Sequence, residues 1–201
     1  ERGHAEHRAE DLLLEHAHVV DAGEDGRLDV VAARQAALEL CLAAAELQLK
    51  EMMAREFVLQ RKLAPVLSRY DYIIIDTPPT LGMLTINALS AARFVLIPMA
   101  CQYMALRGLD TLLGTIEQIR HDLNPRLGLL GILATNYDSR TLHSREVFEY
   151  LTELCARQGL PLFNTYIKAS VRFHEAPNER TPLVLLHPEL EGAKAYVDVA
   201  Q

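Results

Sequence analysis

Residues 71–79 form the segment of this sequence that most directly suggests chemistry. Three consecutive isoleucines lead to one carboxylate, Asp76, which is followed by Thr77, Pro78 and Pro79. An unbroken β-branched run is typical of a parallel strand covered on both faces, and ligands of open α/β sheets collect at the carboxyl ends of such strands. Asp76 would there hold Mg²⁺ through water. The alternative is an aspartate that caps the next helix or shapes the turn.

The segments around Asp76 alternate between helical and strand-like patterns. A helix over 80–93 and a buried strand over 94–98 complete the strand–helix–strand unit that a parallel sheet needs. Further strands are expected at 28–31, 127–135, 163–167 and 183–186, and further helices at 5–17, 32–50, 52–69, 105–122, 144–158 (ending at Gly159) and 188–200, with a polar connection over 18–27. The sequence therefore predicts an α/β fold, a mostly parallel sheet flanked by helices on both faces, in one domain spanning residues 1–201.

Several motifs follow one another in a consistent order along the chain. They occupy residues 72–79 (Tyr-Ile-Ile-Ile-Asp-Thr-Pro-Pro), 84–89, 97–103, 105–109, 131–141, 144–147, 171–177 and 192–196. This series resembles the ParA/Soj family of partition ATPases. The specific resemblance covers residues 70–197, and a weaker one extends back to about residue 10. It implies a P-loop NTPase-like fold, with Mg²⁺ and ATP as cofactors.

The resemblance also implies roles for individual residues. Asp76 would manage Mg²⁺ and the attacking water, and Thr77, Pro78 and Pro79 would form the switch that senses the γ-phosphate. Arg140 and Arg172 would bind DNA phosphates without sequence preference. The alternative for these arginines is a surface ion pair with Glu146 or Glu175. The nucleotide base pocket would include Asn136, Glu175 and Pro177.

The sequence departs from the family's pattern in ways that affect nucleotide binding. The family binds ATP through a Gly-rich loop ending in a lysine, but none of the four lysines of this chain follows a glycine, so no Walker A motif is present. Lys168 stands where relatives commonly have proline, and Glu191 where they often have arginine. Because the P-loop supplies most of the β- and γ-phosphate binding, we expect little or no ATPase activity from this polypeptide alone.

Two explanations of the absent P-loop remain open at this stage. The chain is either a portion of a longer ATPase, without the first P-loop strand of the sheet, or a natural shortened paralogue. The first explanation implies an ATP-dependent partition protein of a bacterial chromosome or plasmid. Such a protein would form a homodimer on non-specific DNA and work with a ParB-like centromere-binding protein. The second implies a non-enzymatic regulatory module that binds DNA or a partner without ATP turnover.

Composition sets the remaining limits on function. Half of the 201 residues are apolar, but no run is long enough to span a bilayer, and the expected location is the bacterial cytoplasm, at the nucleoid. The net charge of −7 argues against a uniformly basic surface, although a local arginine patch can still bind DNA. A metal site at His4 and His7 is disfavoured relative to a solvated N-terminal helix.

Overall fold

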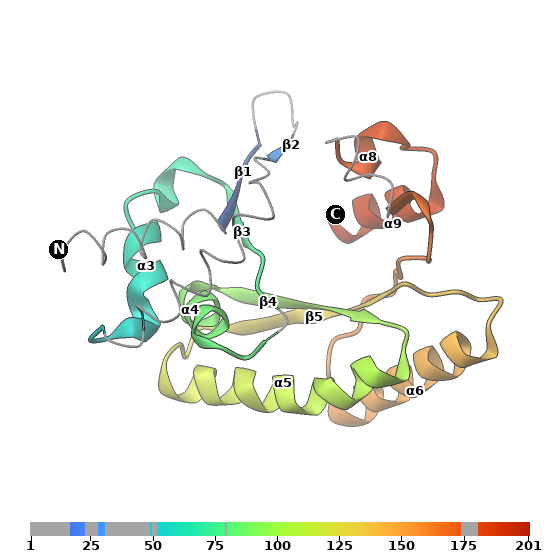
Figure 1. Ribbon diagram of the computed structural model, residues 1–201, viewed down its shortest axis with the longest axis horizontal. Helices are drawn as coiled ribbons and strands as arrows, with labels where there is room; N and C mark the ends of the chain where they lie inside the picture. Colours follow the sequence, from blue (N-terminus) through green and yellow to red (C-terminus); the bar gives the residue numbers. More distant parts are fainter. Residues whose placement is uncertain (1–16, 23–27, 31–48, 50–51, 79, 174–180) are drawn as a thin grey trace. The chain divides into compact units, whose positions relative to one another are not determined.

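The computed structural model describes residues 17–22, 28–30, 49, 52–78, 80–173 and 181–201 (Figure 1). The chain divides into two compact units. Unit 1 comprises residues 1–93 and 114–127, and unit 2 comprises residues 94–113 and 128–201. Each unit contains its own sheet and is described by itself, and the expectation of a single domain stays a prediction.

Unit 1 contains a three-stranded sheet in the order β2-β1-β3. Strand β1 (Ala17–Ala22) pairs antiparallel with both β2 (Leu28–Val30) and β3 (Tyr72–Ile75). The polar connection expected over 18–27 is therefore wrong, because β1 occupies residues 18–22 of this segment. Its only β-branched residues are two adjacent valines, and two residues are too few to indicate a strand. The expected burial of β3 on both faces is also wrong, because Tyr72 and Ile74 are 69% and 57% exposed.

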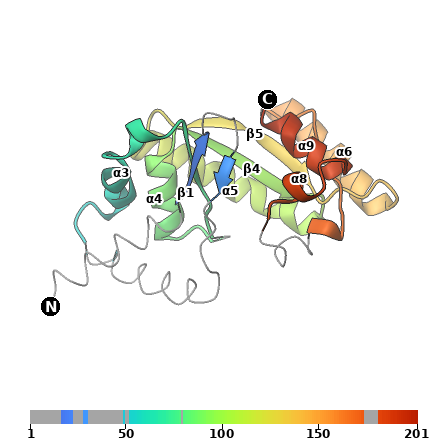
Figure 2. The same cartoon turned by 90° about the horizontal axis from the view of Figure 1, so that it is seen from above.

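The helical part of unit 1 is more broken than the sequence predicts. In place of one helix over 52–69, the chain forms η1 (Arg55–Phe57), α3 (Val58–Leu63) and η2 (Leu67–Arg69). Pro65 explains the interruption, because it lacks the N–H that would continue the helical hydrogen-bond pattern. Helix α4 (Met83–Ala91) packs against α3 (Figure 2). One buried hydrophobic cluster of this unit consists of Leu49, Val58, Leu59, Leu63, Leu84 and Ala88.

One buried amide joins these helices. Asn87, on α4, is fully buried, and its Oδ1 accepts a hydrogen bond of 3.1 Å from the Leu59 backbone N–H. Its Nδ2 donates to the carbonyls of Arg55, at 2.8 Å, and Met83, at 3.0 Å. The end of α4 is held in a similar way, because Asn124 Nδ2 donates to two carbonyls there, 2.7 and 2.9 Å away. Both amides pair with backbone groups at buried or partly buried positions.

Unit 2 is built on the parallel pair β4 (Phe94–Ala100) and β5 (Gly128–Thr135). Helix α6 (Leu142–Gln158) and the first half of α5 (Tyr103–Asp122) lie along one side of this pair in Figure 1. Ile97 and Met99 on β4 are buried, whereas Phe94 and Leu96, on the opposite face, are 60% and 38% exposed.

The ends of α6 follow the sequence closely. The Thr141 hydroxyl accepts a hydrogen bond from the Ser144 N–H at 3.3 Å, which caps the first turn. Gly159 ends the helix with φ 66°, a left-handed conformation that glycine adopts without steric cost. These two caps confirm the predicted helix and its stop.

The two C-terminal strands expected at 163–167 and 183–186 are wrong. The first segment does run beside β5, since the Ile132 and Phe163 N–H groups and the Ile167 N–H donate across to carbonyls of the facing segment. The hydrogen bonds of Phe163 and Ile167 reach carbonyls that are only two residues apart on β5, at Ile132 and Ala134. Since Phe163 and Ile167 are four residues apart, the two segments do not form a regular ladder. The second segment is helix α8 (Leu183–Leu186), preceded by Pro182, and the chain closes with α9 (Glu191–Val199).

Among the residues that the structure describes, no helix is long and apolar enough to cross a membrane.

Candidate functional site

Asp76 lies directly after β3, in unit 1, and its side chain is exposed. Thr77 is exposed beside it, Pro78 is half-buried, and Pro79 lies outside the described residues. Asp76 does not cap the next helix, because Gly82 occupies the N-cap position of α4. Helix capping, one alternative explanation for this carboxylate, is therefore excluded.

The donor set around Asp76 allows a test of the expected Mg²⁺. Magnesium keeps several waters and is usually bound through one or two carboxylates together with substrate phosphates. Asp76 offers one solvated carboxylate with the Thr77 hydroxyl as its neighbour in sequence. Within the described part of the chain, no group of three His, Cys, Asp or Glu side chains could hold a metal. Asp76 therefore fits a water-mediated ion that also needs phosphate ligands.

A second group of predicted residues lies at the carboxyl end of β5, in unit 2. Asn136 has φ 50° and is exposed, and it turns the chain out of the strand. The next residue, Tyr137, donates its N–H to the Ile167 carbonyl at 3.0 Å and accepts from the Ala169 N–H at 2.9 Å. These bonds join residues 136–141 to residues 168–173, and we call the two segments together the β5 loop edge.

Arg140 is held on the β5 loop edge by Asp138. Its Nε donates to Asp138 Oδ1 and its Nη2 to Oδ2, both at 2.9 Å, and its backbone N–H donates to Oδ1 at 3.0 Å. The arginine side chain is 84% exposed. The side-chain hydrogen bond from Arg140, followed by its backbone hydrogen bond, lowers the pKa of Asp138 to about 2. Arg140 thus pairs with Asp138, not with Glu146, while Glu175 lies outside the described residues.

Two further cations belong to the same edge. Arg172 is exposed, and its N–H donates to Ser170 Oγ at 3.3 Å. Lys168 Nζ lies 2.5 Å from Glu191 Oε2, at the start of α9, and this hydrogen bond raises the pKa of Lys168 and lowers that of Glu191. The two departures from the family's pattern at Lys168 and Glu191 are therefore in contact with each other.

The structure brings together only part of the predicted site. Arg140, Arg172 and Asn136 share the β5 loop edge, whereas the remaining base-pocket residues, Glu175 and Pro177, lie outside the described residues. Sequence reasoning missed the pairing of Arg140 with Asp138. The Asp-Ser-Arg spacing in a loop was a signal for it, because an aspartate commonly accepts from the backbone two residues on. Nothing in the sequence signalled the pair between Lys168 and Glu191.

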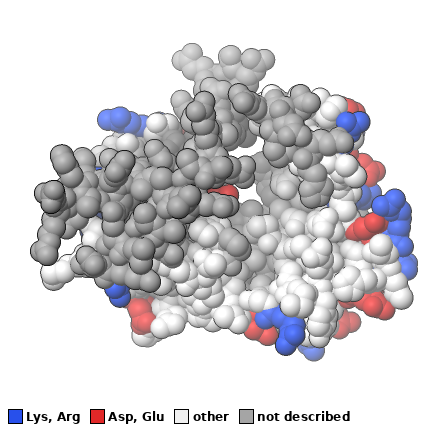
Figure 3. Space-filling view, in the orientation of Figure 1, with Lys and Arg blue, Asp and Glu red and all other residues white. Residues whose placement is uncertain are grey.

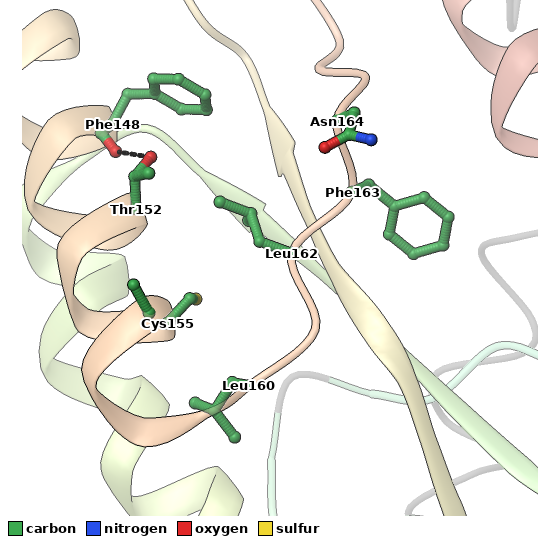
Figure 4. A pocket seen from close by; sticks show the side chains of 8 residues that line it. Phe148, Thr152, Cys155, Leu160, Leu162, Phe163 and Asn164 are labelled. Carbon is green, nitrogen blue, oxygen red and sulfur yellow. Dashed lines mark hydrogen bonds between the residues drawn. The ribbon is translucent and has the colours of Figure 1, made fainter.

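Unit 2 also has two shallow grooves. The larger, about 380 Å³, lies between α6 and the segment after it (Figure 4). Its lining consists of Phe148, Thr152, Cys155, Ala156, Leu160, Leu162, Phe163 and Asn164. Because this lining holds no charged side chain and burial raises the pKa of the Cys155 thiol, the groove suits neither phosphate nor nucleophilic chemistry. The smaller groove, about 220 Å³, contains Lys168 and Glu191.

On the face drawn in Figure 3, Lys and Arg atoms of the described residues lie beside Asp and Glu atoms at several places. This agrees with the net charge of −7 and with the ion pairs of the β5 loop edge.

Comparison with known proteins decides the family. A protein-family model described as an AAA domain matches residues 16–129. The sporulation initiation inhibitor protein Soj of Bacillus subtilis is 39% identical over 204 residues, covering 100% of this chain and 78% of that protein. The chain belongs to the ParA/Soj family. An uncharacterized protein of Mycobacterium tuberculosis is 44% identical over 160 residues, and the match spans 80% of this chain but only 49% of that relative.

A solved structure supports the same fold. Cobyrinic acid a,c-diamide synthase from Mycobacterium smegmatis, determined with a bound ATP analog and magnesium, has a TM-score of 0.66 and 34% identity to this ParA/Soj member. The similarity covers 93% of this chain and 67% of that one. Together with the parallel β4–β5 pair and its flanking helices, it confirms the predicted α/β fold of the P-loop NTPase type.

Proposed function

We propose that this chain is the DNA-binding part of a ParA-type protein that partitions a bacterial chromosome or plasmid. In the full cycle, Mg²⁺ and ATP close a homodimer on non-specific DNA at the nucleoid, and a ParB-like centromere-binding protein triggers hydrolysis. Relatives named Soj and chromosome partitioning protein ParA support this role. In this cycle Arg140 and Arg172 contact DNA, while Asp76, with Thr77 to Pro79, serves the nucleotide.

One structural observation carries the DNA-binding part of the proposal. Arg140 and Arg172 are 32 positions apart in sequence, yet their loops are joined by the backbone hydrogen bonds at Tyr137. Both side chains are exposed. Two guanidinium groups on adjoining loops can contact phosphates without reading bases, which is the chemistry of non-specific binding.

The experiment is a titration of a fluorescent random-sequence duplex with this chain at several salt concentrations, followed by anisotropy. Arg140→Ala or Arg172→Ala removes one phosphate contact. Each is expected to weaken binding roughly threefold to tenfold and to reduce the salt slope by about 0.9.

The matched control is Arg157→Ala. Arg157 is exposed in the last turn of α6, at the end of the helix opposite to Arg140. Its replacement by alanine removes one positive charge from unit 2, as Arg140→Ala does. Its affinity should stay close to that of the wild type. Equal weakening by all three variants would contradict the proposal, since it would reflect net charge alone.

The nucleotide part of the proposal rests on Asp76. Since the Gly-rich loop and its lysine are absent from these 201 residues, we expect Mg²⁺-ATP to bind this chain weakly and to be hydrolysed slowly or not at all. Calorimetry with Mg²⁺-ATP tests this directly. Tight binding that Asp76→Ala abolishes would show a working nucleotide site and would overturn this part.

The alternative function, a regulatory module without ATP turnover, predicts DNA binding that ignores ATP even when the chain is supplied with a P-loop. Adding the N-terminal segment of a relative such as Soj, and comparing DNA affinity with and without ATP, separates the two. ATP-dependent binding by the extended chain favours the partition ATPase.

A further inference from the structure

The cations of the β5 loop edge are matched by carboxylates. Asp138 engages Arg140 through two side-chain hydrogen bonds and one from its backbone, and Glu191 engages Lys168 at 2.5 Å. These pairs belong to the surface on which the proposed function places DNA phosphates. A phosphate that approaches the edge therefore meets negative charge as well as positive charge.

We propose that Asp138 and Glu191 act as built-in competitors of DNA phosphate on the β5 loop edge, keeping its affinity for DNA low. The inference rests on the proposed function, because it concerns the regulation of that same surface. Its occupant is the sugar–phosphate backbone of duplex DNA, which carries the dense, sequence-independent charge that such a balance would control.

A carboxylate beside an arginine can act in two opposite ways. It can fix the guanidinium and so favour phosphate binding, or it can repel the incoming phosphate. The Asp138 pair uses Nε and one N–H of Nη2, so the outer edge of the guanidinium still has donors to offer. Geometry alone permits both effects, and their magnitudes decide between them.

The benefit from fixing the guanidinium is small here. Arg140 is 84% exposed, and an ion pair in such contact with water is too weak to immobilise a long side chain. The same holds for Lys168 and Glu191, whose side chains are 44% and 73% exposed. Neither pair is rigid enough to act mainly as a positioning device.

Repulsion adds up over several phosphates. Duplex DNA carries about one charge per 1.7 Å, so a carboxylate at the interface has about six phosphate charges within one Debye length of about 10 Å on each side along the axis. Each exerts a weak force through water, but all have the same sign. Because these contributions all oppose DNA binding and the gain from fixing the side chain is small, we take competition as the net effect.

The test uses isosteric neutral variants of the intact 201-residue chain. Asp138→Asn keeps the oxygen that accepts from the Arg140 N–H, and Glu191→Gln keeps its length at the start of α9. The double variant is expected to bind a random-sequence duplex roughly threefold to tenfold more tightly at low salt, with a smaller gain at high salt. Adding Arg140→Ala should remove most of this gain.

The control for net charge is Glu149→Gln with Glu153→Gln. Both glutamates are exposed on α6 and belong to neither loop, and their replacement changes the net charge by the same two units. This pair should tighten binding by less than about twofold. An equal gain in both double variants would overturn the inference, because the effect would then be general.

Two other results would also overturn it. Weaker binding by Asp138→Asn and Glu191→Gln would make the carboxylates positioning residues, and a gain that survives Arg140→Ala would place the DNA elsewhere. Failure of the proposed function looks different, because Arg140→Ala would then leave the wild-type affinity unchanged. If Arg140→Ala weakens binding but the neutral variants fail to tighten it, the function stands and only this inference is lost.

Discussion

The end of β3 in unit 1 and the end of β5 in unit 2 differ in how their functional residues are held. Asp76 belongs to the strongest motif in the sequence, yet its side chain makes no hydrogen bond or ion pair with the residues that the structure describes. The β5 loop edge contains a weaker motif, but backbone bonds at Tyr137 join its two segments, and Asp138 accepts hydrogen bonds from Arg140.

This difference teaches that a recognisable motif and a completed site are separate properties. A Mg²⁺-binding aspartate needs phosphates and the loop that cradles them before it has anything to bind. A phosphate-binding arginine on a surface needs only a loop that presents it. The β5 loop edge is therefore expected to work within this chain, and the end of β3 only with a P-loop.

The largest effect is expected from Asn87→Ala in unit 1. This variant tests whether unit 1 affects DNA binding only by stabilising the folded chain. It removes three hydrogen bonds from a buried side chain to the backbone and should lower the free energy of unfolding by about 2–4 kcal/mol. Urea denaturation measures the loss. DNA affinity, measured where the variant is still folded, should remain unchanged, and a change would break the comparison.

The matched control for that variant is Ser90→Ala on the same helix. Ser90 Oγ is buried and has no hydrogen-bond partner among the residues that the structure describes, so its removal relieves an unpaired polar group. The free energy of unfolding should then stay within about 0.5 kcal/mol of the wild type or rise. A loss as large as that of Asn87→Ala would show that volume, not hydrogen bonding, holds α4.

A smaller effect is expected from Gly131→Ala, which disturbs the support of the β5 loop edge. An added Cβ would lie 2.7 Å from the Phe163 ring and 3.3 Å from the Pro161 carbonyl oxygen. Overpacking of this kind costs about 1–3 kcal/mol, and the displaced segment should also weaken DNA binding. Both losses are measured by denaturation and anisotropy.

Gly114→Ala provides the comparison for Gly131. A Cβ there meets nothing within 4 Å, and Gly114 lies inside helix α5, so alanine should stabilise the chain by about 0.5–1 kcal/mol. If Phe163→Leu fails to rescue Gly131→Ala, the close approach to this ring is not the cause of the loss.

The smallest effect concerns pH. Arg140 lowers the pKa of Asp138 from 3.8 to about 2, so the folded state favours the ionised carboxyl. The stabilisation from this pair is therefore complete above about pH 4 and is lost as the pH falls through about 2. An NMR titration of the Asp138 carboxyl should show the low value, and Arg140→Ala should restore the ordinary one. Arg145→Ala should leave it low, and an ordinary value in the wild type would contradict the pairing.

The sequence predicted the elements whose signals are local. The strands β4 and β5 and the helices α5 and α6 appear close to their expected bounds, because long apolar runs and the caps at Thr141 and Gly159 lie within the segments themselves. Strand β1 was missed because its pairing with β3 comes from residues some 50 positions away. The apolar run of α8 was ambiguous, since four residues have no diagnostic period.

The same division applies to the site. The resemblance identified Asp76, Arg140 and Arg172 as candidates, because their motifs are contiguous in sequence. It could not show that Asp138 occupies Arg140 or that Lys168 meets Glu191, because those contacts depend on loop conformation and on a separation of 23 residues. The sequence spacing hints at the contact of Asp138 with Arg140, whereas the contact of Glu191 with Lys168 is visible only in the fold.

The most direct test of the difference between the end of β3 and the end of β5 is a measurement of DNA affinity with and without Mg²⁺-ATP. It compares the wild-type chain with Asp76→Ala and Arg140→Ala. The account predicts equal wild-type affinity in both conditions, no effect of Asp76→Ala, and a roughly threefold to tenfold loss with Arg140→Ala. An ATP-dependent gain in affinity that Asp76→Ala abolishes would contradict it, because the end of β3 would then already be a complete nucleotide site.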